Sequence, residues 1–303
     1  MHSSLAIGAA LGSGCCFAVS SVLQHRGAAC APRSSGVRLL GHLVVRPIWW
    51  AGLLAAGGTL VLQAVALSAG ELVFVQPLML VGLLFALPVS VLLEKRRPSV
   101  QEWGWAALLV IGLTVFLRAA NPAAGPPLPD NWRMVQLGAA AVGLSALAAA
   151  GGFGPGRRHR AALLGLATGI AYGLSAALMK YSFGLASDHI GRLLASWPGY
   201  ALLAVGTAGI LLNQAAYHAG PLAGALPPLA IADPVVAIVF GVAAFSEGLA
   251  TTAGALTLQV LGFGAVAIAI VQLARQSAGR DPRDPTADGG AARPAPAKPA
   301  SRS

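Results

Sequence analysis

Long apolar stretches, separated by short polar connections, run through most of the chain. Nine of them are about 20 residues long, which is enough for a helix to cross the roughly 30 Å of hydrocarbon in a bilayer. They lie at about 5–24, 48–68, 72–93, 100–117, 134–153, 161–180, 197–217, 221–245 and 252–273. The fifth is the weakest, because it is rich in alanine and glycine. The pattern predicts an all-α, polytopic membrane protein with about nine transmembrane helices.

The composition points to lipid as the solvent. Of the 303 residues, 56% are hydrophobic and 10% are charged, whereas roughly a quarter are charged in soluble domains. The net charge of +10 resides in connections and the tail rather than in one basic stripe, so we expect no nucleic acid partner.

Signatures of catalysis are missing from the sequence. The three cysteines have neither metal-ligand spacing nor a disulfide pairing. The chain also lacks a phosphate loop, paired metal-binding histidines and a nucleophile elbow. We therefore expect no enzyme, no cofactor and no metal site. Any transport would run on existing gradients or be passive.

Basic residues gather in every second connection between the predicted spans. With the N-terminus outside, the inward segments hold Arg26, Arg33, Arg38, Arg46, Lys95, Arg96, Arg97, Arg157, Arg158, Arg160 and the basic tail. The outward connections hold only Arg118, Arg133 and Arg192, with Lys180 at an outer helix end. Because cytoplasmic loops carry the excess of Lys and Arg, this distribution predicts a cell membrane protein with an outside N-terminus and a cytoplasmic C-terminus.

The second half of the chain repeats residues of the first. At an offset of about 155, Ser13, Gly14, Phe17, Ser20 and His25 match Thr168, Gly169, Tyr172, Ser175 and Lys180. At an offset of about 150, Gln63, Ala66, Ala69, Gly70 and Pro77 match Asn213, Ala216, Ala219, Gly220 and Pro227. About five spans precede the second copy, so the copies would enter the membrane from opposite sides, as inverted repeats do.

The repeat divides the chain into three predicted parts. Residues 1–153 form the first repeat, with about five spans, and residues 154–276 form the second, with about four. Residues 277–303 are rich in proline, alanine and arginine without hydrophobic periodicity, which predicts a disordered, basic cytoplasmic tail.

Several motifs carry a resemblance to a known family. The first half contains RPIWWAG (46–52), AVALSAGELVFVQPL (64–78) and LLEKRRPS (92–99). The second half contains NQAAYHAGPLAGALPPL (213–229) and ADPVVAIVFGVAAFSE (232–247). The second-half motifs are similar to the EamA-type repeat of the drug/metabolite transporter superfamily, and the first-half motifs resemble its NIPA-like magnesium-transporter branch. The resemblance covers roughly residues 5–273 and implies two paired halves and transport.

One departure concerns the cargo. NIPA-like members carry an acidic residue in the second helix, near the position of Leu60. This chain has an uncharged leucine there, and the nearby polar residue is Gln63. Divalent cations prefer carboxylate oxygens, so whether magnesium is carried stays open. The chain is therefore identified as similar to the superfamily, with the NIPA-like branch as the part of it that it resembles most.

Asp233 is the only acidic residue near the middle of a predicted span. An ionised carboxylate there is costly unless it faces a polar cavity or is protonated, so we rank it first among the pathway candidates. Protonation would couple transport to a proton gradient. Pro227, Pro228 and Pro234 would free backbone carbonyls for a cation or a polar solute. The alternative is a helix cap before Pro234.

Amides form the next group of candidates. Gln63, Asn213 and Gln214 lie at matching depths in the second spans of the two halves, where they either line a pathway or join helices through hydrogen bonds. Gln76 precedes Pro77 in the first-half counterpart of the Pro227 segment. A helix break there would expose backbone to a cavity, and a simple kink is the alternative.

Hydroxyl groups are the third group. Tyr172, Ser20 and Ser175 lie in the paired first spans and are candidates for a central site. Such serine side chains also bond back to their own helix, which is the simpler interpretation.

Charged residues at span ends are candidate gates. His25 and Lys180 end the paired first spans on opposite faces of the membrane. For Lys180 the default expectation is that the side chain extends to the interface. Glu94 and Glu247 close equivalent spans of the two copies, where we expect interface anchoring.

Together these patterns predict a secondary transporter of a small solute or cation that works by alternating access, with lipid around it. A homodimer is compatible with the sequence. The alternative is a membrane scaffold or partner subunit that keeps the duplicated fold without transporting, and flipping of a lipid-linked substrate is a third hypothesis.

Overall fold

The computed structural model describes residues 2–29, 47–82, 99–126, 128–154, 159–186, 190–220 and 222–278. Its helices are α1 (His2–Ala29), α3 (Pro47–Ala69), α4 (Leu72–Met79), α6 (Val100–Ala120), α7 (Asn131–Phe153), α8 (Arg160–Ala186), α9 (Ile190–Ala195), α10 (Trp197–Ala219), α11 (Leu222–Ala243) and α12 (Ala253–Ala278). Outside these ranges lie residues 83–93 of the third predicted span, Glu94, and residues 279–303 of the predicted tail.

The described helices fit a multi-pass membrane protein. Seven of them, α3, α6, α7, α8, α10, α11 and α12, are long and apolar enough to cross a bilayer. The weakest predicted span corresponds to α7. Helix α1 carries a shorter apolar stretch, Ser4–Ser20. Since the third span is described only as far as residue 82, the total of nine stays a prediction.

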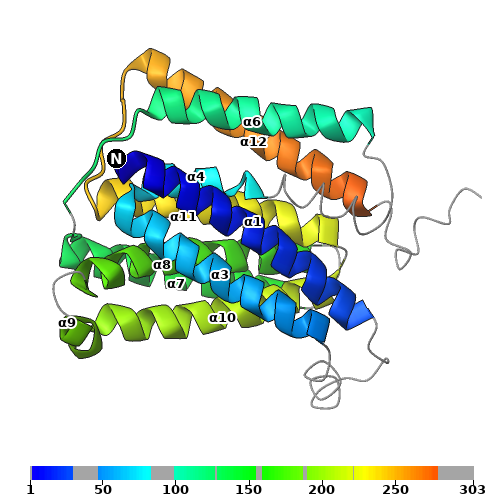
Figure 1. Cartoon of the computed structure of the whole chain (residues 1–303), viewed down its shortest axis with the longest axis horizontal. Coiled ribbons are helices and arrows are strands. Elements are labelled where there is room, and N and C mark those ends of the chain that lie inside the picture. The colour runs from blue at the N-terminus through cyan, green and yellow to red at the C-terminus, as the bar shows by residue number, and fades with distance from the viewer. Residues whose placement is uncertain are drawn as a thin grey trace, which may run out of the picture.

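The long helices lie side by side along one direction and form a bundle (Figure 1). The most extensive contacts join α1 to α3, α8 to α10 and α11, and α6 to α12. Helix α8 is the most deeply buried of the long apolar helices. It therefore forms the centre of the described bundle, with α10 and α11 packed on it.

One end of the bundle, called here the N-terminal end, holds the start of α1 and the start of α12, and the last residues of α12 lie at the opposite end (Figure 1). Two connections meet there through an antiparallel bridge between Ala123 and Gly248. A further backbone hydrogen bond of 3.0 Å runs from the Asp130 amide to the Ala244 carbonyl. The connection before α7 and the connection before α12 are thereby joined.

Small residues allow close packing of α8 on α11. A Cβ atom built on Gly169 would lie 2.8 Å from the Ala232 Cβ, and one on Gly173 would lie 2.6 Å from the Asp233 carbonyl oxygen. Both distances are shorter than side chains permit, so glycine is required at the closest approach. The stripe of small residues, present in the sequence, thus brings the Asp233 backbone against α8.

The prolines act differently in the two halves. Helix α4 contains Pro77 and ends at Met79, where Leu80 and Val81 change to hydrogen bonds with carbonyls three residues earlier. The helix is thus distorted just after Pro77, and both the predicted break and its alternative, a simple kink, stay predictions. In the second half the helix is not broken, because α11 runs without interruption through Pro227, Pro228 and Pro234. Packing along α8 holds α11 in one helix, although each proline removes one helical hydrogen bond.

Two helices of the first half begin with well-formed caps. The Ser99 hydroxyl accepts from the Glu102 amide and the Glu102 carboxylate accepts from the Ser99 amide, which is a capping box at the start of α6. The Asp130 carboxylate accepts from the amides of Trp132 and Arg133 at the start of α7.

Candidate functional site

Three of the predicted pathway residues place buried polar atoms inside the bundle without a protein partner. These atoms are Gln76 Nε2, Asn213 Oδ1 and Asp233 Oδ1, none of which meets a hydrogen-bonding group of the structure. Gln76 is only 3% exposed. A buried polar atom without a partner costs about 1–3 kcal/mol. We call these three side chains the interior polar set.

The packing of the helices orders the interior polar set by depth. Helix α4 starts beside the end of α11 and contacts it, so it runs back along α11. Val73 lies against Gly241, and Gln76 follows one turn later. Asp233 lies about two turns before Gly241 on α11, or about 12 Å along the axis. Gln76 is therefore at a level between the N-terminal end and Asp233.

Asn213 lies deeper in the same direction. Trp197 at the start of α10 stacks edge-on against Tyr181 at 6.0 Å between ring centroids, so α10 runs antiparallel to α8. Gly209 of α10 lies against Tyr172, next to Gly173 and hence at the level of Asp233. Asn213 is one turn beyond Gly209. The set thus occupies three successive levels from the N-terminal end toward the middle of the bundle.

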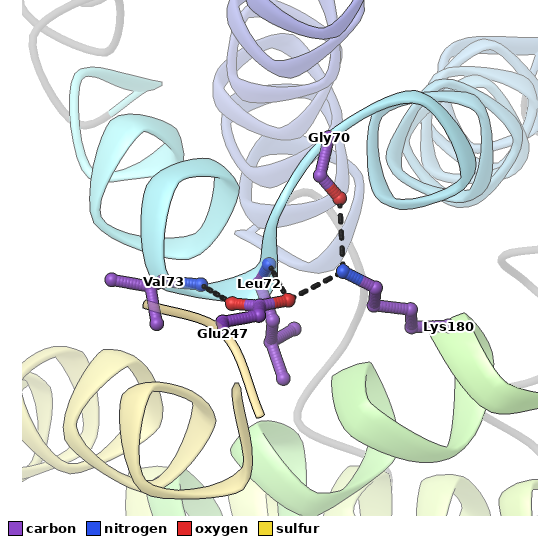
Figure 2. Close-up of polar contacts among 5 residues, drawn as sticks. All are labelled: Gly70, Leu72, Val73, Lys180 and Glu247. Carbon is purple, nitrogen blue, oxygen red and sulfur yellow. Dashed lines mark hydrogen bonds and ion pairs between the residues drawn. The ribbon is translucent and has the colours of Figure 1, made fainter. Parts of the chain in front are cut away.

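A charged cluster lies where α4 begins, next to the connection that follows α11 (Figure 2). One carboxylate oxygen of Glu247 accepts from the Leu72 amide at 2.7 Å, and the other accepts from the Val73 amide at 2.8 Å. The Lys180 ammonium contacts Glu247 at 2.5 Å and donates to the Gly70 carbonyl at 3.1 Å. We call Gly70, Leu72, Val73, Lys180 and Glu247 the end cluster.

The electrostatics of the end cluster are mutually satisfied. The Glu247 side chain is completely buried, and the Lys180 side chain is 14% exposed. The carboxylate caps the start of α4, where the free amides and the helix dipole favour negative charge. The Lys180 ammonium also lies 5.1 Å from the centre of the Phe245 ring. Each charge therefore has an opposite partner.

This arrangement corrects two sequence-based expectations. Lys180 does not extend to the interface, because its ammonium points inward to Glu247 and Gly70. Glu247 is not an exposed anchor, because it is 2% exposed. Reasoning from the sequence missed their pairing. The available signal was that the topology predicted from basic residues places the ends of both spans, and the connection at Gly70, on the same side.

The remaining predicted residues fall into different environments. Ser175 bonds back to the Ala171 carbonyl of its own helix at 2.8 Å, and Ser20 donates across to the Gly52 carbonyl of α3 at 2.9 Å. Tyr172 packs against Gly209. Ser20 and Tyr172 therefore contact a neighbouring helix, whereas the Ser175 hydroxyl stays within α8.

Two amides and one histidine are not gathered with the interior polar set. Gln214 is exposed on α10, and Gln63 is partly buried on α3. The His25 side chain lies outside the described residues. Pro77 is buried beside Gln76 in α4, and Pro227 is buried in α11 with Pro228 beside it.

The interior polar set offers groups that can form hydrogen bonds. The interior polar set provides one carboxylate and two amides. Within the ranges described above, no three His, Cys, Asp or Glu side chains gather at one place. A divalent cation prefers several oxygen ligands including carboxylates, so this set suits a hydrogen-bonding solute or a monovalent cation better.

Comparison with known proteins finds a relative that matches most of the chain. The chain is 33% identical over 249 residues to an uncharacterized protein of Corynebacterium glutamicum, a match that covers 80% of this chain and 85% of the relative. The chain belongs to the same family as that protein. No family model matches the chain, and no solved structure matches it. The match is long enough to include the greater part of both halves.

Proposed function

We propose that this protein is a secondary transporter of a small polar solute or monovalent cation, with its pathway along the interior polar set. The observation that supports this most directly is the group of three buried polar atoms without protein partners in a bundle of apolar helices. In lipid, unpaired polar groups are expensive and mark solute or ion pathways. A scaffold would gain stability from apolar residues at these positions.

Alternating access requires two related halves, and contacts between α6 and α12 support such a relation. A Cβ atom built on Gly112 would lie 2.8 Å from the Gly262 carbonyl oxygen, and one on Gly262 would lie 2.7 Å from the Gly112 carbonyl oxygen. Gly112 also faces the Val266 nitrogen, and Gly262 faces the Phe116 nitrogen. Both pairs are separated by the repeat offset of about 150. Reciprocal contacts of this kind arise around a two-fold axis.

A second pair of contacts is also repeated. Gly14 of α1 lies against Gly82, so that a Cβ atom on Gly14 would be 2.7 Å from the Gly82 Cα. Gly169 of α8 lies against Ala232 in the same manner. The two contacts are related by the sequence offsets of about 155 and 150. They favour an arrangement in which residues 1–153 and 154–276 are inverted copies.

Membership of the drug/metabolite transporter superfamily is part of this proposal. It draws on the motif resemblance and on the packing of the first span of each half against the second and third. The distribution of basic residues favours a plasma membrane location with the N-terminal end of the bundle outside. Within this proposal, Asp233 is the residue whose protonation couples the cycle to a proton gradient.

Uptake into proteoliposomes tests the proposal. The purified full chain is reconstituted under an imposed proton gradient, and uptake of labelled amines, amino acids, sugars and monovalent cations is measured, with magnesium alongside. We expect gradient-dependent uptake of at least one polar solute by the wild type and a loss in Asp233→Asn. If no class is taken up while the protein stays folded, the scaffold is favoured.

A further inference from the structure

The end cluster links three segments that are far apart in the sequence. Glu247 lies in the connection between α11 and α12, Lys180 lies in α8, and Gly70, Leu72 and Val73 lie where α3 gives way to α4. In Figure 2 the carboxylate lies between the start of α4 and the ammonium. The amides of Leu72 and Val73 and the Lys180 ammonium all bind this carboxylate. The remaining hydrogen bond of the end cluster joins Lys180 to the Gly70 carbonyl. Removing the carboxylate would therefore break the polar contacts between the start of α4 and the second half.

The contact is built as a single unit. Glu247 passes close to Gly241, where an added Cβ would lie 2.5 Å from one carboxylate oxygen, so only glycine admits the carboxylate there. Both carboxylate oxygens accept from amides of α4, and one of them also binds Lys180. Loss of the carboxylate therefore removes these three contacts at the same time. Such a contact has two discrete states, formed and broken.

A buried charge pair is a poor choice for a purely structural link. Removing two charges from water is expensive, and well-packed apolar side chains often stabilise as much or more. Two other links at this end, Ala123 to Gly248 and Asp130 to Ala244, use backbone hydrogen bonds without charge. Those links would persist when the carboxylate is released.

We propose that the end cluster is a latch that closes the N-terminal end of the bundle over the path to Asp233. This inference rests on the proposed transport function. The face of α11 below the latch carries Gly241, then Ala237, then Asp233, at spacings of one helical turn. When the latch opens, the start of α4 separates from the connection after α11 and water reaches this face.

Thiol labelling in nanodiscs tests the latch without a known substrate. In a chain whose three cysteines are replaced by serine, a cysteine is introduced at Ala237 or at Ala225, both 0% exposed and on α11. The two positions lie about 18 Å apart along the helix. Each variant is combined with Glu247→Gln and treated with a charged maleimide that does not cross membranes.

The expected result is selective exposure. Ala237→Cys should react about tenfold faster in the Glu247→Gln background, because the open state gains population, and Ala225→Cys should keep its rate. Lys180→Met should give the same selectivity, which covers the case that Glu247→Gln does not fold. Lys180→Arg should leave both rates low.

Glu102→Gln is the matched control. Glu102 is also 2% exposed and also accepts a backbone amide at a helix start, but it lies in the capping box of α6. Its loss should leave both rates low or raise both equally. Equal acceleration at Ala237 and Ala225 in Glu247→Gln, or no acceleration, would overturn the latch.

The outcomes for the latch and for transport are separable. Selective labelling with no uptake of any solute would contradict the proposed function and leave a latch that opens the bundle. Uptake by the wild type with equal labelling at the two positions would contradict the latch alone.

Discussion

Two acidic residues of the second half, Glu247 and Asp233, have opposite surroundings. Glu247 has two backbone amides and a lysine ammonium against its carboxylate. Asp233 lies 14 positions earlier in the sequence, and the structure places no protein donor on its Oδ1. The same functional group thus holds elements together in one place and is left available in the other.

Structural and pathway residues in this bundle can be separated by whether the protein itself satisfies their polar groups. A carboxylate that the protein satisfies contributes to stability, and its removal leaves other charges without partners. A carboxylate that the protein does not satisfy costs stability, so its presence needs another reason. Stability and uptake should therefore respond in opposite ways to changes at the two positions.

The largest effect on stability is expected from Glu247→Leu. The change leaves the Lys180 ammonium and the amides of Leu72 and Val73 without their acceptor, which should lower the free energy of unfolding by about 3–5 kcal/mol. Thermal unfolding in detergent, followed by fluorescence, measures the change. An equal decrease in unfolding temperature in Asp233→Leu would contradict the claim that Glu247 stabilises the fold and Asp233 does not.

The next effect is a loss of transport in Asp233→Asn. Uptake driven by a proton gradient should fall about a hundredfold, equivalent to about 2.7 kcal/mol, because the amide cannot exchange a proton. The unfolding temperature should stay the same or rise. Asp130→Asn, at an exposed cap outside the span, is the matched control and should transport normally. Normal, pH-dependent uptake by Asp233→Asn would remove the coupling role.

Gly173→Ala should have a smaller effect, confined to the middle region. The new Cβ would lie 2.6 Å from the Asp233 carbonyl oxygen and 2.7 Å from the Val236 Cβ. Such overpacking costs about 1–3 kcal/mol. Gly143→Ala on α7 meets nothing within 4 Å and should be neutral. Chemical denaturation of the two variants compares them, and equal stability would contradict the close packing of α8 on α11.

The smallest effect is expected at Gln214. Its side chain is exposed on α10, so Gln214→Leu should change stability by less than about 0.5 kcal/mol and leave uptake unchanged. Its neighbour Asn213 has a buried oxygen, and Asn213→Leu should reduce uptake. Uptake assays on the two variants in parallel check this, and a larger loss in Gln214→Leu would reverse the assignment.

The long apolar helices were predictable because hydropathy and bilayer thickness alone determine them. The ends of these helices were harder to predict. The sixth span was predicted to end at Lys180, yet α8 continues to Ala186, since the ammonium is neutralised by Glu247 and does not need to reach water. The continuity of α11 through three prolines depends on packing against α8, which a single segment does not encode.

The candidate site was also predictable only in part. The depth of Asp233 follows from its place in an apolar stretch, so it was found from the sequence. The pairing of Lys180 with Glu247 joins residues 67 positions apart and depends on where α4 begins. That start is set by the packing of α4 on α11, a tertiary contact without a local signal.

The most direct test of the central claim is whether water reaches the interior polar set. In a cysteine-free chain reconstituted in nanodiscs, Gln76→Cys and Asn213→Cys are treated with a charged, membrane-impermeant thiol reagent, with Leu203→Cys on the exposed face of α10 as the control for lipid contact. We expect the two interior cysteines to react and a transported solute to slow the reaction, while the Leu203 variant stays unreactive. Complete protection of both interior positions, in a folded protein, would contradict a pathway through this bundle.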